Sequence, residues 1–401
     1  MDYKKLYSHV VSRAKASAIR ELLKVTAMPE IISFAGGLPA PELFPTKDVA
    51  DILQTIMKQT PQEALQYGTT EGQKSLKTQL IKMLQETEHI TVEPENILMV
   101  SASQQALDMS ARMFINAGDA ILVARPTYLG ALQAFQVAGA DIIGVESDKD
   151  GMIPADVEKK LAALQTEGRP CKFIYVVPDF QNPTGTTISE PRRVQILELA
   201  KKYGTFILED SPYRQVRFEG KHLPTFYELD GGAGHVLTLF TFSKVFVPGF
   251  RLGFIVGPKD VIARFVILKQ AMDLCTSPFL QLATAEYLRR GLLAQHIKEI
   301  IECYREKRDL MLETLKKYMP QGVTWTHPEG GLFLWLTLPK HLNSSELLTK
   351  AIANKVAFVA GVDFYPECNV FNDMRLNFSY SSKEQIVEGL KRLAQTIKEN
   401  L

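Results

Sequence analysis

The stretch that decides the fold of this chain reads Leu239-Phe240-Thr241-Phe242-Ser243-Lys244-Val245-Phe246-Val247-Pro248-Gly249-Phe250-Arg251-Leu252-Gly253. We expect its apolar residues to form a strand that ends at Ser243 and holds Lys244 in an apolar wall. Desolvation there favours the neutral, nucleophilic amine that forms a Schiff base. Ser243 and Arg251 could hold a phosphate nearby, so the stretch suits a covalently held, phosphorylated aldehyde. A surface lysine in a strand-to-loop turn remains an alternative.

A second predicted strand, Thr205-Phe206-Ile207-Leu208, ends in Glu209-Asp210-Ser211-Pro212-Tyr213. Open α/β sheets bind their ligands at the carboxyl ends of strands, so Asp210 is expected to reach a pocket. Pyridoxal phosphate needs an anion beside its ring nitrogen, because the protonated ring accepts electrons from a carbanion. At ~4 Å and an effective dielectric near 20, such a pair interacts by roughly 4 kcal/mol. A helix cap or a magnesium ligand is the alternative role for this acid.

Two further segments carry polar groups at predicted strand ends. Pro178-Asp179-Phe180-Gln181-Asn182-Pro183-Thr184-Gly185 is a tight loop whose Asn182 could donate to the phenolate oxygen of the cofactor ring, although an ordinary Asn-Pro turn remains open. In Val100-Ser101-Ala102-Ser103-Gln104, a helix start would offer free N–H groups to an anion, and a plain serine cap explains Ser103 equally well. Tyr128 follows the next strand and could stack on a planar cofactor.

These segments together resemble the fold-type I pyridoxal-phosphate aminotransferases over nearly the whole chain. The series of matching positions is Phe34-Ala35-Gly36-Gly37-Leu38-Pro39, Tyr67 with Gly72, Ser103-Gln104, Tyr128, Asn182-Pro183-Thr184-Gly185, Asp210 with Tyr213, Ser243-Lys244, Arg251 and Arg375. Within the family, Ala16-Ser17-Ala18-Ile19-Arg20 and the segment from Phe34 to Pro45 resemble the branch of 2-aminoadipate, kynurenine and broad-specificity aromatic aminotransferases.

The resemblance implies a role for each matching residue around the cofactor, pyridoxal 5'-phosphate. Lys244 would be the Schiff-base lysine and proton shuttle, and Asp210 would pair with the ring nitrogen. Asn182 and Tyr213 would bond the phenolate oxygen, and Tyr128 would stack on the ring. The phosphate would be held by Ser103, Gln104, Ser243 and Arg251.

The resemblance also implies roles toward the substrate and a second subunit. Arg375 would clamp the substrate α-carboxylate through a bidentate pair, helped by Asn182 and the backbone at Gly37. Tyr67 would reach the phosphate of the other subunit, so a homodimer would share its active sites. Arg20 would meet a distal carboxylate or swing away from an apolar side chain, and a solvated helix-face arginine is the alternative.

Three positions depart from the family pattern. Ala102 stands where many relatives carry glycine, Thr241 where many carry serine, and Lys77 where an arginine often occurs. Thr241 keeps a hydroxyl, and none of the three changes removes a group that the chemistry requires.

Global properties agree with a cytoplasmic enzyme. The 401 residues are 46% hydrophobic, enough for one large core and a smaller one. The formal charge of +1, without long basic runs, argues against nucleic acid as a partner. The four cysteines lack paired spacing and the seven histidines lack metal-ligand spacing, so no disulfide framework or metal site is expected. No run approaches a membrane span, and the start lacks a signal peptide.

The expected architecture is α/β, a three-layer sandwich with a mostly parallel sheet and a smaller α+β domain. We assign 1–45 to an N-terminal helix and arm that packs with the small domain and a dimer partner, 46–290 to the large cofactor-binding domain, and 291–401 to the small C-terminal domain. Thr46 is expected to cap a helix with Val49, Ile52, Leu53 and Ile56 on one face. Leu332–Leu336 and Val356–Val359 are expected strands of the small domain.

The leading function is transfer of an amino group from an L-amino acid to a 2-oxo acid by a ping-pong mechanism. The expected acceptor is 2-oxoglutarate. A lyase or decarboxylase on the same scaffold is the alternative, because the cofactor stabilises several carbanions. A ligand-sensing transcription regulator is disfavoured, since only about 30 residues precede Phe34, too few for a DNA-binding domain. A cofactor-free structural protein conflicts with the presence of both Lys244 and Asp210.

Overall fold

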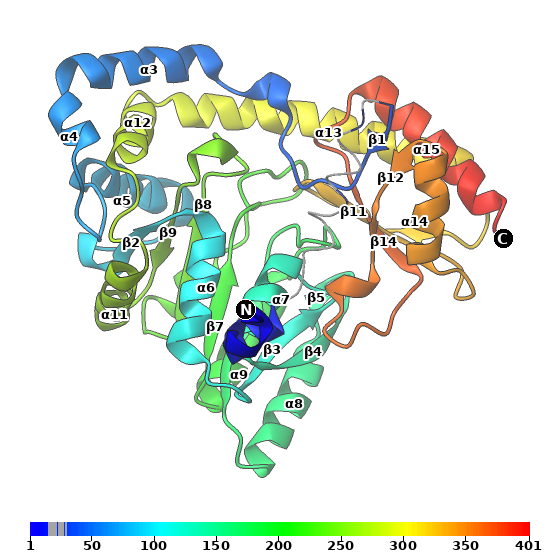
Figure 1. Ribbon diagram of the computed structural model, residues 1–401, viewed down its shortest axis with the longest axis horizontal. Coiled ribbons are helices and arrows are strands. Elements are labelled where there is room, and N and C mark those ends of the chain that lie inside the picture. The colour runs from blue at the N-terminus through cyan, green and yellow to red at the C-terminus, as the bar shows by residue number, and fades with distance from the viewer. Residues whose placement is uncertain (15–21, 23–27, 29) are drawn as a thin grey trace.

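An eight-stranded sheet forms the centre of the larger domain (Figure 1). The computed structural model describes residues 1–14, 22, 28 and 30–401. The strands are, in spatial order, β2 (Ile97–Val100), β9 (Gly253–Val256), β8 (Val236–Thr241), β7 (Phe206–Asp210), β6 (Cys171–Val176), β3 (Ala120–Arg125), β4 (Asp141–Asp148) and β5 (Gly151–Met152). Only β9 and β5 run against the others. Near-continuous apolar runs such as Ile97–Val100 form these strands because both faces of the sheet are covered.

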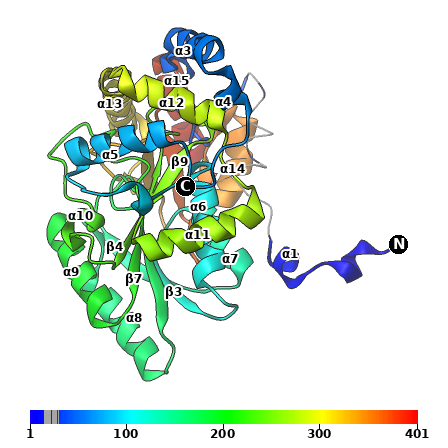
Figure 2. The same ribbon diagram turned by 90° about the vertical axis from the view of Figure 1, so that its left-hand side faces the viewer.

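Helices cover both faces of this sheet. In the view of Figure 2, α6 (Ala102–Phe114), α7 (Leu129–Ala138) and α11 (Lys259–Met272) lie on one side, and α8 (Pro154–Thr166), α9 (Glu190–Lys202) and α10 (Phe226–Asp230) lie on the other. This arrangement confirms the predicted three-layer α/β fold with a mostly parallel sheet. Within the described ranges, none of the helices combines the length and apolar character of a membrane span.

A helical layer lies beside the β2 edge of the sheet. It contains α3 (Thr46–Gln59), α4 (Pro61–Leu65), α5 (Lys74–Glu88) and α12 (Pro278–Arg289), which pack on one another. In α3, Ile52 and Ile56 are buried as the apolar periodicity predicts. The predicted cap at Thr46 is wrong: Thr46 is the first helical residue, Pro45 occupies the cap position, and a turn bond from the Thr46 N–H to Phe44 O starts the helix instead.

The smaller domain follows the long helix α13 (Leu292–Tyr318), which runs across the top of the molecule (Figure 1). Its antiparallel sheet has the order β10 (Thr324–Trp325), β11 (Phe333–Thr337), β14 (Asp373–Asn377) and β13 (Val359–Ala360), and it is accompanied by α14 (Ser344–Ala353) and α15 (Lys383–Lys398). The capping box of Ser382 and Gln385 starts α15.

The expected single strand over Val356–Val359 is divided in two. β12 (Val356–Ala357) pairs in parallel with β1 (Ile32–Ser33), whereas β13 pairs with β14 in the other sheet. The chain therefore changes sheets at Phe358, which a continuous apolar run does not reveal.

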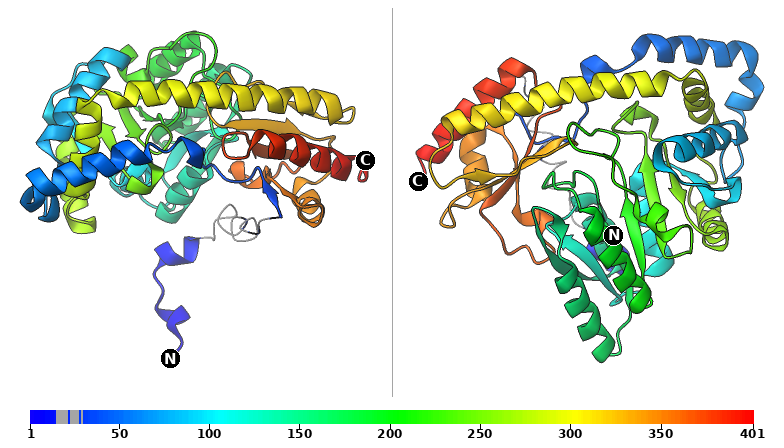
Figure 3. Two further views of the ribbon diagram at one scale, coloured as in Figure 1. Left: turned by 90° about the horizontal axis from the view of Figure 1, so that it is seen from above. Right: turned by 180° about the vertical axis from the view of Figure 1, so that it is seen from behind.

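The N-terminal segment joins the small domain through β1 and carries 3-10 helix η1 (Tyr3–Leu6) and helix α1 (His9–Arg13) at its start. Seen from above, these first residues project away from the body of the molecule (Figure 3). α1 contacts α7, where Arg13 Nη1 donates to Ala138 O at 3.4 Å. Arg20 lies outside the described residues. The remaining short 3-10 helices are η2 (Pro41–Leu43), η3 (Pro94–Asn96), η4 (Pro248–Phe250) and η5 (Val362–Phe364).

Candidate active site

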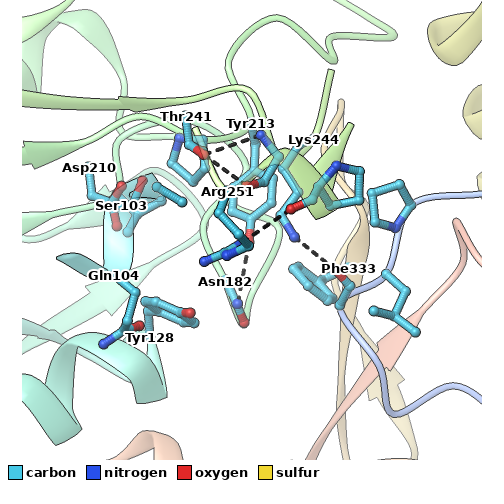
Figure 4. Close-up of a pocket in the computed structure, with 18 of the residues that line it drawn as sticks. Ser103, Gln104, Tyr128, Asn182, Asp210, Tyr213, Thr241, Lys244, Arg251 and Phe333 are labelled. Carbon is cyan, nitrogen blue, oxygen red and sulfur yellow. Dashed lines mark hydrogen bonds between the residues drawn. The ribbon is translucent and has the colours of Figure 1, made fainter. Parts of the chain in front are cut away.

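A cavity of about 290 Å³ opens at the carboxyl ends of β6, β7 and β8, where the large and small domains meet (Figure 4). Eleven of the thirteen residues that the sequence predicted for the site line this cavity: Gly37, Ser103, Gln104, Tyr128, Asn182, Asp210, Tyr213, Ser243, Lys244, Arg251 and Arg375. They come from the end of β7, from the segments that follow β3, β6, β7 and β8, from the first turn of α6, from β14 and from the segment after β1. Tyr67 is absent from this lining, and Arg20 lies in the undescribed part of the chain.

Lys244 follows β8 and its Nζ donates to Gly37 O at 2.8 Å. Burial, together with the positive charges of Arg375 and Arg251, lowers the pKa of the Lys244 amine from 10.5 to about 8. At pH 7.5 about a quarter of such an amine is neutral, compared with about 0.1% of an ordinary lysine. The surroundings therefore supply the nucleophilic form that the sequence led us to expect.

Asp210, the last residue of β7, is buried with 2% of its surface exposed. Burial raises the pKa of its carboxyl group from 3.8 to about 7, although Tyr175, Ser103 and Lys244 each oppose this rise. Oδ2 accepts a hydrogen bond from Tyr175 Oη at 3.0 Å. Oδ1 is buried and accepts no hydrogen bond from the described residues. An unpaired carboxylate oxygen in a buried pocket wall suits a protonated ring nitrogen, which would donate to it.

Asn182 is held between two other site residues. Its Oδ1 accepts from Arg375 Nη1 at 2.9 Å, and its Nδ2 points to Tyr213 Oη at 3.4 Å. The loop that carries it must be tight: Gly185 has φ +71°, and a Cβ there would meet Phe333 O at 2.6 Å. Asn182 and Tyr213 thus lie together on the wall of the cavity.

An ion cluster beneath this loop ties it to the segment that carries Tyr213. Asp179 accepts from Arg193 Nη2 at 2.8 Å, from Arg214 Nη1 at 3.2 Å and from Arg217 Nη2 at 3.2 Å, and all four side chains are buried. Although burial alone would raise the pKa of Asp179, the arginines lower it to about 2. Asp179 therefore stays ionised and anchors the loop.

Arg375 on β14 is a buried cation with 1% of its surface exposed. Its Nη2 donates to Ala35 O at 2.6 Å, and its guanidinium lies 4.3 Å from the ring centre of Phe333. No carboxylate among the described residues pairs with it, and its Nε–H has no acceptor there. Burial lowers the pKa of Arg375 to about 10, so it remains charged near neutral pH. A buried cation without an anion is a site for a carboxylate ligand.

Hydroxyl and cationic groups suited to a phosphate lie around the mouth of the pocket. Ser243 Oγ accepts from Thr241 Oγ1 at 3.0 Å, and Arg251 is exposed close by. The first turn of α6 adds N–H groups of Ser103 and Gln104, which have no acceptors within the helix. The Ser103 hydroxyl itself lies beside Asp210 and not beside Arg251 (Figure 4).

The backbone conformation at Ala102, one of the three departures from the family pattern, is of a kind that favours glycine. Its φ of +61° is a conformation that glycine adopts freely and alanine adopts at a cost of about 1 kcal/mol. The strained residue starts α6 and lines the pocket.

Sequence reasoning missed two residues that contact the site. Tyr175 and Phe333 lie inside apolar strands, where nothing distinguishes them from core residues. Phe333 packs against both Arg375 and the edge of Tyr213, whose ring centre is 5.8 Å away.

Comparison with known proteins identifies the family. Residues 40–393 match the family described as aminotransferase class I and II. The chain is 44% identical over 401 residues to aromatic-amino-acid aminotransferase 1 of Thermococcus litoralis, covering 100% of this chain and 96% of the relative. It is 37% identical over 400 residues to 2-aminoadipate transaminase of Thermus thermophilus, covering 99% and 98%.

A solved structure with the same fold is that of Pyrococcus horikoshii kynurenine aminotransferase in complex with PMP, with a TM-score of 0.96, 44% identity and coverage of 100% of this chain and 98% of that one. The chain belongs to the class I and II aminotransferases. It is a pyridoxal-phosphate-dependent transaminase of fold type I, in the branch of aromatic, kynurenine and 2-aminoadipate aminotransferases.

Proposed function

We propose that the protein transfers the amino group of an aromatic, aliphatic or 2-aminoadipate-type L-amino acid to 2-oxoglutarate. The observation that carries the proposal is that Lys244 and Arg375 contact carbonyls two residues apart, Gly37 O and Ala35 O. Two residues of chain span at most ~7 Å. Arg375 and Lys244 therefore reach the same short stretch of chain, and we infer that a carboxylate bound at Arg375 would direct its α-carbon toward Lys244 Nζ.

The proposed roles divide the chemistry among the lining residues. Bound pyridoxal phosphate supplies a ring that accepts electrons when the substrate α-proton leaves. Lys244 Nζ, in its neutral form, would accept that proton, and Asp210 would hold the ring nitrogen. Arg375, held by Asn182, orients the α-carboxylate so that the α-C–H bond points to Lys244. Ser243 and Arg251 bind the phosphate.

The pocket walls favour an apolar substrate side chain. Leu38, Pro39 and Phe333 line the cavity, and the cationic residues among its described lining are Lys244, Arg251 and Arg375. All three have proposed roles toward the cofactor or the α-carboxylate, so a distal carboxylate of the substrate requires another cation. We propose Arg20 as this cation, which would allow 2-oxoglutarate and aromatic donors to bind in one site.

We also propose a homodimer with shared active sites. Tyr67 supports it, because 80% of its surface is exposed in one chain although it belongs to the family's series of site residues. Mixing Lys244→Ala chains with Tyr67→Phe chains should then restore part of the activity, since one site of each heterodimer would carry neither defect.

Steady-state kinetics with a panel of amino acids and 2-oxoglutarate tests the proposed reaction. Transfer by a ping-pong mechanism gives parallel double-reciprocal lines and requires the oxo acid. Release of ammonia, pyruvate or carbon dioxide without an oxo acid would indicate a lyase or decarboxylase instead.

A further inference from the structure

The two oxygens of Asp210 have different surroundings. Oδ2 accepts from Tyr175 Oη at 3.0 Å, whereas Oδ1 accepts no hydrogen bond from the described residues. Asp210 lines the cavity, and Tyr175 lies behind it in the sheet. One oxygen is therefore tied to the sheet, and the other remains for a ligand.

Tyr175 is held rigidly in the middle of the fold. It lies on β6 opposite Leu208 of the parallel neighbour β7, two residues before Asp210. Its ring is fully buried and packs against the edge of Phe135, with ring centres 5.4 Å apart. Because its surroundings fix the ring, the direction in which the hydroxyl donates is also fixed.

We propose that Tyr175 is a positioning residue that favours the ionised form of Asp210 and leaves its Oδ1 for the ring nitrogen of the bound cofactor. The inference rests on the role proposed above for Asp210 and adds the group that makes this role possible. Tyr175 is not among the residues that line the cavity, so it would act through the Asp210 carboxylate.

Opposing effects act on the charge of the Asp210 carboxylate, so a second residue is needed to favour its ionised form. Burial favours its neutral form, and the hydrogen bond from Tyr175 is the largest of the effects that favour the charged form, ahead of Ser103 and Lys244. Burial and the neighbouring carboxylate raise the pKa of the Tyr175 hydroxyl well above 10, so it remains a donor throughout the working pH range. Its donation to a charged acceptor is strong.

Loss of this donor would move a proton. In the wild-type holoenzyme, an ionised Asp210 would favour the proton on the ring nitrogen. Without the Tyr175 hydroxyl, Asp210 becomes more basic and takes that proton, which leaves the ring neutral. A hydrogen bond to a charged group is worth about one to two pH units in this equilibrium.

The test uses the holoenzyme reconstituted with pyridoxal phosphate labelled with ¹⁵N in the ring, and it follows the ¹⁵N chemical shift with pH. Tyr175→Phe should move loss of the ring-nitrogen proton to a pH about one to two units lower. Tyr365→Phe is the matched control, because Tyr365 also donates to a buried carboxylate, Asp373 Oδ2 at 2.5 Å, but lies outside the cavity lining. Its titration should equal that of wild type. Identical titrations in Tyr175→Phe and wild type would overturn the inference.

Asp210→Asn separates failure of this inference from failure of the role proposed for Asp210. A ring nitrogen that stays protonated in Asp210→Asn would remove the role of Asp210 itself. A changed titration in Asp210→Asn but not in Tyr175→Phe would remove only the role of Tyr175.

A second measurement applies if Tyr175→Phe does not fold. The wild-type holoenzyme should show a downfield hydroxyl proton, protected from exchange, that moves upfield in Asp210→Asn because a neutral amide oxygen accepts a weaker hydrogen bond than a carboxylate. Its absence from the wild-type spectrum would also overturn the inference.

Discussion

Arg375 offers a sharp test of how the pocket recognises its substrate. Two of its five N–H donors are used within the chain, one by Asn182 Oδ1 and one by Ala35 O. Three remain, including Nε–H, which is enough for a bidentate pair with a carboxylate. Lysine has three donors in all, so Arg375→Lys leaves at most one for the ligand if both internal bonds persist.

The expected loss follows from that count. Each hydrogen bond between charged groups contributes about 1.5–3 kcal/mol, so losing one lowers kcat/KM about 10- to 150-fold. The amino acid and the 2-oxo acid both carry an α-carboxylate, and the two should therefore lose similar factors. An amine with the same side chain but no carboxylate should react equally slowly with both enzymes.

The assay is kcat/KM, or the single-turnover rate for the amine, measured for all three compounds with wild type and Arg375→Lys. Arg308→Lys is the control, because Arg308 is equally buried and donates to Pro328 O at 2.6 Å, but is not among the residues that line the cavity. An equal loss for the amine would refute the reasoning, since it would show that Arg375 supports the fold and does not bind the carboxylate.

Three further perturbations have defined outcomes. Asp179→Asn should lower the free energy of unfolding by about 3–5 kcal/mol, because it leaves the buried Arg193 without its carboxylate partner and takes one of two from Arg214 and Arg217. Asp148→Asn, which removes an exposed partner of Arg192, should cost under about 1 kcal/mol, and similar urea midpoints for the two variants would contradict this. The rate at which the apo-enzyme binds the cofactor covalently should rise with pH and level off above about pH 8, because the Lys244 amine loses its proton over that range. A rate that continues to rise to pH 10 would contradict the lowered pKa of Lys244. Arg20→Ala should lower kcat/KM for acidic substrates by one to three orders of magnitude and change kcat/KM for aromatic donors little. Equal losses for both substrate types would show that Arg20 does not bind the substrate side chain.

The residues at strand ends were predictable from the sequence because their chemistry contrasts with the apolar runs before them. Lys244, Asp210 and Asn182 each follow such a run, and parallel strands bring their carboxyl ends to one edge. The predicted three-layer fold with its mostly parallel sheet is also confirmed. It was predictable because alternating strands and helices are compatible with few other arrangements.

Other features depend on contacts that no local pattern contains. Tyr175 meets Asp210 only because β6 and β7 are neighbours in the sheet, and Asp179 meets its arginines only after two loops and a helix converge. The division of Val356–Val359 between two sheets depends on β1, which lies more than 300 residues earlier. Pairing across the fold decides these features, so the sequence alone could not predict them.

The central claim is that Lys244 binds the cofactor covalently, and reduction of the purified holoenzyme with borohydride tests it directly. Reduction fixes the bond between the amine and the cofactor aldehyde carbon, and mass mapping of the peptides then locates it. We predict the phosphopyridoxyl group on Lys244 and its absence from the reduced Lys244→Ala protein. A phosphopyridoxyl group on another lysine, such as the buried Lys269, or on none, would contradict the account.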